Sequence, residues 1–494
     1  MPTSDPGPRR RRAHSAAGPT ALDITADVTD APGIANRFRV FAEQVVPRLP
    51  LYRRLCEAAA DDLDVCARLL AAPPDQRTPN LLLAAVHDVL LAGAPEPLAA
   101  WYPSIPGRNP SPQARSRVVG RGEDDPWPHF RAMALGNPSV AELLTSRSVQ
   151  TNEVGRSAAL FPGLYQATFA ASSAPPGNLR PLGIVEIGAS AGLNLHPGAY
   201  GYRYTVSSRS DDAGRTLTAG RTFTAVGSSS RLMLDCELRG DKVPPLPEGA
   251  LPVASAVGLD ISPLNLVDPV DTRWLEACQW PEQPERMARL RAAIALARLD
   301  PPDVRRGDAI DDLERQIAQV PGEALPVVTS TWVLTYVPIH RQRALMELMD
   351  AIGTERDVAM VLSEQPERIP GIDVPPRPDG APDGRSTALV RLEWRDGERI
   401  AVRLADQHPH GNWLEWPAPP SPPSPPLPNF VWSRFVHEPL SHEVRFGRPH
   451  PPRTSCGAGS SVDRFHTRFD RGGEGWGGVA EVTVSDSGVP GSQG

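Results

Sequence analysis

The chain has 494 residues, of which 40% are hydrophobic and 22% charged, so it carries enough apolar material for more than one sizeable core. Its formal net charge of −7 excludes a global basic field that would recruit nucleic acid or an anionic membrane. Five cysteines, an odd number without C-x-x-C spacing, argue against a disulfide framework or a zinc site and favour a reducing, cytoplasmic compartment.

Both ends of the chain are expected to be disordered. Residues 1–32 contain 9-RRRR-12 with no apolar run after it, which predicts a solvated arm rather than a secretory signal. Residues 417–494 begin with a proline-rich run and continue rich in Gly, Ser and Arg, a composition that cannot bury enough apolar surface to fold alone. No stretch approaches the roughly 18 apolar residues of a membrane span, so no membrane segment is expected.

Residues 33–175 are predicted to form a mostly α-helical region. Apolar residues step by four, three and four from Ile34 to Val45, which places them on one face of a helix. The segment 80-NLLLAAVHDVLLAG-93 continues this pattern, and Gly93 provides a stop signal.

From about residue 176 to 416 the pattern changes to short apolar runs that alternate with helices, which is typical of a parallel α/β sheet. Leu182–Ile187 is the first candidate strand, and Ala189–Leu195 is predicted to open the following helix. Residues 199–240 are β-prone and punctuated by Gly and Ser, so we expect an antiparallel insertion there.

Later strands are expected at Ala254–Leu259, Asp303–Arg306, Leu325–Leu334 and Val358–Ser363, and a hairpin at 392–404. The sequence therefore predicts an α/β fold, with a Rossmann-like, mostly parallel sheet and a closing antiparallel hairpin, preceded by the helical region.

The stretch 184-IVEIGASAGLN-194 allows two interpretations. Its G-x-S-x-G centred on Ser190 fits the nucleophile elbow of an α/β-hydrolase. The same residues, entered through Glu186, fit a glycine-rich turn that holds a nucleotide cofactor at a helix N-terminus. An elbow needs earlier sheet strands and an oxyanion loop upstream, and the sequence indicates neither. The hydrolase alternative stays open because a Ser-Asp-His order can be assembled from Asp268 or Asp308 with His340, His408 or His410.

The nucleotide interpretation explains more residues at once. Gly188 and Gly192 let the backbone turn tightly and approach a ligand, and a helix beginning near Ser190 would offer unpaired N–H groups. Asp260, which ends the next parallel strand, could accept both hydrogen bonds of a ribose diol. Asp308, after the third strand, is placed to receive an adenine amino group.

The series E-x-G-x-x-x-G, G-x-D-x-S-P, G-D-A and an apolar strand with T-Y-V-P resembles the motifs of Rossmann-like S-adenosylmethionine-dependent methyltransferases. Those enzymes usually have Gly where this chain has Ser190. The resemblance implies S-adenosylmethionine as cofactor and an unidentified methyl acceptor, either a small molecule or a protein. It also implies that the cofactor-binding residues are Glu186, Gly188, Ser190, Gly192, Asn194, Asp260 and Asp308.

Residues 33–416 also resemble a bacterial family catalogued only as a domain of unknown function (DUF2332), a label that implies no activity. The segments that carry this resemblance are 150-QTNEVGR-156, 185-VEIGASAGLNL-195, 258-GLDISPLNLVDP-269 and 410-HGNWLEW-416. A non-catalytic member of the fold that acts through its helical region or its tail is therefore a third hypothesis.

Further polar and aromatic residues could line the pocket: Gln150, Asn152, Glu153, Arg156, Trp332 and Tyr336. Those before the first strand would either close over a cofactor or form a capping network. Structural alternatives exist for the acids as well, since Asp260 and Asp308 suit helix N-caps and Glu186 could simply pair with Arg156. The sequence nominates no metal site and no catalytic base, because methyl transfer depends mainly on alignment.

Overall fold

The computed structural model describes residues 28–105, 125–170, 179–206, 209–210, 216–218, 221–225, 230–240, 242–247, 249–377 and 387–417. The predictions made for the N-terminal arm up to residue 27 and for the tail beyond residue 417 lie outside these ranges. Within them, no helix is both long and apolar enough to cross a membrane.

Helices occupy the first part of the described chain: α1 (Ala31–Val40), η1 (Phe41–Val45), α2 (Pro50–Ala60), α3 (Leu63–Arg68), η2 (Leu69–Ala71), η3 (Pro74–Gln76), α4 (Pro79–Leu91), η4 (Pro97–Trp101), α6 (Trp127–Gly136), α7 (Pro138–Ser146), η5 (Val154–Arg156) and α8 (Ser157–Ala170). Asp30 caps α1 by accepting a hydrogen bond from the amide of Gly33 (2.8 Å). Every residue of α4 from Leu81 to Leu90 is buried, so α4 is the central helix of this region.

One eleven-stranded sheet forms from the strands of the described residues, in the order β5 (Arg221–Ala225), β2 (Gly201–Val206), β6 (Met233–Arg239), β13 (Trp413–Glu415), β12 (Glu398–Gln407), β11 (Thr387–Arg395), β10 (Val358–Glu364), β9 (Leu325–Thr331), β1 (Leu182–Ile187), β7 (Val253–Asp260) and β8 (Val304–Arg306). Neighbours from β8 to β10 are parallel, and their order is 3-2-1-4-5, as in a Rossmann fold. All six residues of β1 are buried, as a central parallel strand requires.

The predicted hairpin is confirmed as β11 and β12, which pair antiparallel, with β11 lying antiparallel beside β10. The sheet then continues through β13 into the strands of the predicted insertion. β2 and β5 pair antiparallel, as expected, but β2 and β6 are parallel, so the prediction of a purely antiparallel insertion is wrong. The reason is that β5 returns along one side of β2, and the chain then crosses to the other side and reverses again. A separate pair consists of β3 (Arg209–Ser210) and β4 (Thr216–Thr218).

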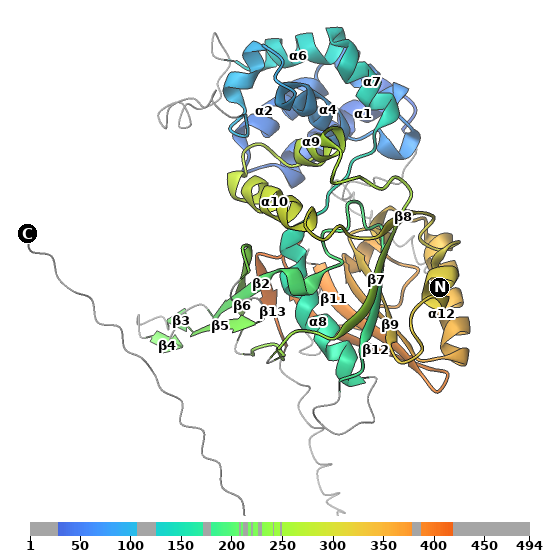
Figure 1. Cartoon of the computed structure of the whole chain (residues 1–494). Coiled ribbons are helices and arrows are strands. Elements are labelled where there is room, and N and C mark those ends of the chain that lie inside the picture. The colour runs from blue at the N-terminus through green and yellow to red at the C-terminus, as the bar shows by residue number, and fades with distance from the viewer. Residues whose placement is uncertain are drawn as a thin grey trace, which may run out of the picture. The chain divides into compact units, whose positions relative to one another are not determined.

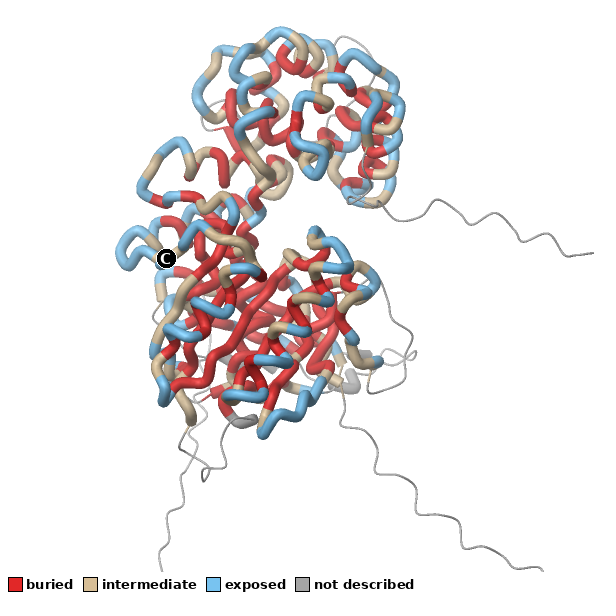
Figure 2. The backbone as a smooth tube through the Cα atoms, turned by 90° about the vertical axis from the view of Figure 1, so that its right-hand side faces the viewer, coloured by how far each residue is buried: buried red, intermediate tan, exposed pale blue. Residues whose placement is uncertain are grey.

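Helices cover both faces of the sheet (Figure 1). Alternate strand residues divide between two apolar clusters, so that Ile184 and Val327 share a cluster with α8, and Val185 and Val328 share the other with α11 (Leu313–Ala318) and α12 (Ile339–Glu355). The central strands are buried along their length (Figure 2). The predicted α/β class is therefore confirmed.

Two helices connect the sheet with the helical region. α9 (Pro269–Ala277) packs against α4 among the helices of the first part of the chain (Figure 1). α10 (Pro284–Ala297) contacts η5. The remaining short turns are η6 (Pro197–Ala199), η7 (Leu334–Tyr336) and η8 (Pro366–Arg368).

Candidate functional site

The turn after β1 is left-handed at three positions, since Gly188, Ser190 and Gly192 have φ values of 64°, 56° and 75°. A Cβ on Gly188 would lie 2.3 Å from a methyl carbon of Val333, so only glycine fits there. The glycine turn expected from the sequence is therefore present, and its middle position holds a serine in a conformation that L-residues seldom adopt.

No α-helix follows this turn, so the prediction that Ala189–Leu195 opens a helix is wrong. The chain instead runs through turns into η6. The positive φ of Gly192 breaks a helical path, and the amide of Leu193 donates to Oδ1 of Asn152 (3.0 Å) rather than to a carbonyl of its own turn. The site consequently has no helix N-terminus at this turn to hold an anion.

Asp260 ends β7 beside the glycine turn. Its carboxylate accepts hydrogen bonds from the amides of Ser190 and Ser262, both at 2.8 Å. The amide of Leu264 in turn donates to the carbonyl of Ser190 (3.1 Å). Asp260 therefore braces the turn after β1 against the loop after β7.

Asp308 follows β8, and its carboxylate is occupied by neighbouring backbone amides and an arginine. Its Oδ1 accepts from the amides of Ile310 and Asp311 and pairs with Arg341 at 2.5 Å. No hydrogen bond or ion pair among the described residues joins it to Glu186. The three acids of the cofactor hypothesis thus lie at the same edge of the sheet, but Asp308 is engaged elsewhere.

Glu186, on β1, is a buried acid with 1% of its surface exposed, and its Oε2 has no hydrogen-bond partner. Burial and the neighbouring charge of Asp260 raise the pKa of Glu186 to about 8, although Asn194 and Arg156 act to lower it. The carboxyl is therefore mainly protonated at neutral pH.

Two further buried polar atoms near Glu186 make no hydrogen bond of normal geometry: Oγ of Ser190 and Nδ2 of Asn194, although Asn194 lies close enough to lower the pKa of Glu186. The other side-chain atom of Asn194, Oδ1, accepts from the hydroxyl of Ser157 (2.6 Å). Buried polar groups are almost always hydrogen-bonded, so a group of unpartnered ones indicates a place where water or a ligand binds.

A second buried acid, Glu364, ends β10 and was not expected from the sequence. Its Oε1 accepts from the hydroxyl of Ser330 (2.7 Å) and from the amides of Val333 (2.9 Å) and Leu334 (3.2 Å), while its Oε2 has no partner. Burial raises the pKa of Glu364, and these donors and Arg156 offset part of that increase.

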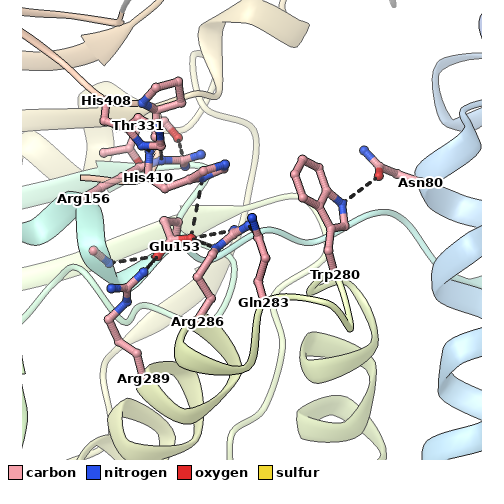
Figure 3. A network of polar contacts seen from close by, with 12 residues as sticks. Asn80, Glu153, Arg156, Trp280, Gln283, Arg286, Arg289, Thr331, His408 and His410 are labelled. Atoms are coloured by element: carbon pink, nitrogen blue, oxygen red, sulfur yellow. Dashed lines mark hydrogen bonds and ion pairs between the residues drawn. The ribbon is translucent and has the colours of Figure 1, made fainter. Parts of the chain in front are cut away.

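Arg156 interacts electrostatically with both acids and is itself buried. It donates to the carbonyls of Pro409 (2.8 Å) and Thr331 (3.1 Å) (Figure 3). Its guanidinium lies 5.8 Å from the ring centre of Trp332. Trp332 has a φ of 59°, a second strained position at this edge. We call the following residues the switch-point cluster: Arg156, Glu186, Ser190, Asn194 and Glu364.

Tyr336 lies near the cluster and is 57% exposed. Burial raises the pKa of its phenol, Arg156 lowers this pKa, and Glu364 raises it.

Beside the cluster lies a network around Glu153 (Figure 3). Arg286 binds its Oε2 (2.6 and 2.7 Å), Arg289 binds its Oε1 (3.2 Å), and Nδ1 of His410 lies 3.6 Å from Oε2. Burial would raise the pKa of Glu153, but Arg286, His410, Arg289 and Arg156 lower it to about 2. Glu153 is therefore an ionised buried carboxylate.

The hydrolase hypothesis requires a histidine hydrogen-bonded to Ser190, and the described residues contain no such contact. The hydroxyl of Ser190 is buried without a partner, and no described histidine bonds to it. His408 and His410 instead lie beside each other (ring centres 5.4 Å apart), and Asp268 caps α9 by accepting from the amide of Val270. Among the residues that the structure describes, no group of three or more His, Cys, Asp or Glu side chains could hold a metal ion.

A family model described as an uncharacterized protein conserved in bacteria, DUF2332, matches residues 35–416. The chain belongs to the DUF2332 family. The match extends from the first helices to β13, and the description of the family names no activity. No curated protein and no solved structure matches the chain.

In this DUF2332 chain the four segments that carry the family resemblance (150–156, 185–195, 258–269 and 410–416) meet at one edge of the sheet. The first segment connects the other three. Gln150 donates to the carbonyl of Ser262 (3.1 Å), Asn152 accepts from the turn after β1, and Gly155 contacts Gly411 so closely that a Cβ on Gly411 would lie 1.9 Å from its carbonyl oxygen.

Sequence reasoning missed Glu364, Arg286 and Arg289. The signal for Glu364 was its position as the last residue of a buried strand, the same position that Asp260 has on β7. The two arginines lie on a helix whose polar residues look like an ordinary solvated face, and nothing local in the sequence connects them to Glu153.

Proposed function

We propose that this DUF2332 protein binds S-adenosylmethionine at the switch-point cluster and transfers its methyl group to an acceptor. Ligands of open α/β sheets bind where the strand order reverses, which here is between β1 and β9. The observation that carries the proposal is the pair of buried, unpartnered carboxyl oxygens, Oε2 of Glu186 and Oε2 of Glu364, which both interact with Arg156.

The residues fit one end of this cofactor well. Its amino-acid end is a zwitterion, and its sulfonium adds a positive charge. Glu186 and Glu364 would hold the cationic groups, and Arg156 would hold the carboxylate. The adenosine end finds fewer free acceptors, because Asp260 already binds two amides and Asp308 is paired with Arg341.

The bound cofactor would supply an activated methyl group, and the residues of this chain would orient it and exclude water. Glu364 is suited to orientation because three donors fix its Oε1. Methyl transfer depends more on alignment of the acceptor with the methyl group than on a general base, so this reaction does not require a dedicated base in the cluster.

The protonation state of Glu186 makes the binding of a cationic ligand depend on pH. With a pKa of about 8 in the free protein, it must release its proton to receive a cation. We therefore expect the affinity for a cationic ligand to rise as the pH increases toward about 8 and to level off above that value.

Calorimetric titration with S-adenosylmethionine tests the proposal. Glu186→Gln keeps the shape of the side chain and removes its charge, so we expect binding at pH 8 to weaken about tenfold or more, as for the loss of a hydrogen bond to a charged group. The rise of affinity with pH should also disappear in this variant.

Glu347→Gln is the matched control, since Glu347 is an exposed acid on α12. It should bind like the wild type. A wild-type protein that does not bind the cofactor, or a Glu186→Gln variant that binds it equally well, would contradict the proposal.

A further inference from the structure

The network around Glu153 has an excess of positive charge. Three arginines, Arg156, Arg286 and Arg289, face this one carboxylate. Glu186 and Glu364 also interact with Arg156, but burial raises the pKa of both and so reduces the negative charge that they contribute. Such a local excess is notable in a chain whose net charge is −7.

The positions of two of these arginines are electrostatically unfavourable. Arg286 and Arg289 lie one turn apart on α10 and converge on the same carboxylate, where like charges repel. Burial lowers the pKa of Arg286, Glu153 raises it, and Arg289 lowers it further. An additional anion at this place would relieve the repulsion.

Free donors are present in the same network. All three nitrogens of Arg286 are engaged, because Nε and Nη2 bind Glu153 and Nη1 donates to Oε1 of Gln283. Arg289 uses Nη2 on Glu153, and its buried Nε has no partner. Nδ1 of His410 also makes no hydrogen bond and donates in the tautomer that carries its proton there. The guanidinium fork of Arg289 can therefore receive an oxyanion through two parallel hydrogen bonds once its Nε is reached.

Solvent reaches parts of these side chains but not Nε of Arg289 or Nδ1 of His410, which are buried, and an aromatic residue lies beside them. The side chains of Arg289 and His410 are 19% and 21% exposed. Trp280 stands edge-on to His410, with ring centres 6.0 Å apart, and its Nε1 donates to Oδ1 of Asn80 (3.3 Å), so the helical region holds this ring in place (Figure 3).

We infer that Arg289, with His410 and the charge of Arg286, forms a binding site for an oxyanion group, either a carboxylate or a phosphate, of a small ligand. This site adjoins the switch-point cluster through Arg156, which contributes to both. That the ligand is the methyl acceptor rests on the proposed function, whereas the oxyanion site itself does not.

Titrations with inorganic phosphate and with acetate, each in the full-length protein without S-adenosylmethionine, test the inference. At least one of the two should bind saturably, and the tighter one identifies the class of oxyanion. Arg289→Gln should weaken that binding about tenfold or more, because it removes charge-assisted hydrogen bonds. Arg291→Gln on the same helix, whose arginine pairs with Glu276, should leave it unchanged.

Arg289→Lys guards against a folding artefact, since it keeps the charge but loses the planar fork. Its binding should lie between that of the wild type and that of Arg289→Gln, with an unchanged melting temperature. If neither anion binds the wild type, or if both Arg289 variants bind as tightly as it does, the inference is wrong. Cofactor binding with no oxyanion binding would overturn this inference alone, and the reverse result would overturn the proposed function alone.

Discussion

Glu153 remains ionised in a place where burial alone would protonate it, since Arg286, His410, Arg289 and Arg156 lower its pKa from 4.5 to about 2. A carboxyl whose pKa is lower in the folded than in the unfolded state stabilises the fold above its unfolded pKa. This stabilisation is lost as the pH falls from about 4.5 to about 2. The shift corresponds to about 3 kcal/mol at neutral pH.

We therefore expect Glu153→Gln to lower the free energy of unfolding by about 3 kcal/mol at pH 7, because it leaves buried arginines without their carboxylate. The difference from the wild type should shrink as the pH falls toward 2, where the wild-type carboxyl is itself neutral. Urea unfolding at several pH values measures both. Glu276→Gln, which breaks a more exposed ion pair with Arg291, should cost less than about 1 kcal/mol. A difference that does not depend on pH would contradict the assignment of charge to Glu153.

At the scale of residues, the sequence indicated every residue of the switch-point cluster except Glu364. Glu186, Ser190 and Asn194 follow from one strand and its turn, where a short motif specifies them. Glu364 and the arginines of α10 become visible only through contacts between distant segments; Arg286 lies 133 positions from Glu153. A local pattern cannot report such a contact, because each of these residues alone is compatible with a solvated surface.

The elements of the sheet were predictable for a physical reason. Buried parallel strands need continuous apolar, β-branched runs, and such runs marked β1, β7, β9 and β10. The prediction of a helix after the glycine turn was wrong because Asn152 binds the amide of Leu193 and so draws it away from a helical hydrogen bond. Asn152 lies 41 positions before that amide, so no local pattern indicates the contact. The parallel pairing of β2 and β6 was likewise set by a crossing of the chain and not by its local propensity.

The contact between η5 and the loop before β13 allows a test at the scale of elements. Gly411 has a φ of 75°, and a Cβ there would lie 1.9 Å from the carbonyl oxygen of Gly155. Gly397, in the hairpin turn, has a φ of 80° with nothing near its Cβ position. Both replacements by alanine incur the left-handed strain of about 1 kcal/mol, and only Gly411→Ala adds a backbone clash.

We expect Gly397→Ala to destabilise the protein by about 1 kcal/mol. Gly411→Ala should cost about 3 kcal/mol or more, as overpacking adds to the strain. Thermal and urea unfolding of the two variants measure the difference. If both variants lost the same free energy of unfolding, segments 150–156 and 410–416 would not be in close backbone contact.

At the scale of the whole molecule, the segment 269–298 joins the helical region to the candidate site. Its first helix, α9, packs on α4. Between α9 and α10, Glu282 accepts hydrogen bonds from the amides of Leu51 (2.8 Å) and Tyr52 (3.0 Å) at the start of α2. Its second helix, α10, carries the arginines that bind Glu153. The helical region therefore positions one wall of the oxyanion site.

This arrangement predicts that the helical region is incomplete without α9. Trp274 and Leu275 of α9 are buried, and the buried imidazole of His87 on α4 binds the carbonyl of Ala277 (3.0 Å). A fragment of residues 28–149 lacks these partners and would expose apolar surface of α4 to water. We expect it to melt without a cooperative transition and to bind a hydrophobic dye, whereas residues 28–417 should melt cooperatively. Adding a peptide of residues 266–283 should reduce dye binding, because it restores the missing cover. A fragment that melts cooperatively and ignores the peptide would show that the helical region folds independently, and that α9 only rests on its surface.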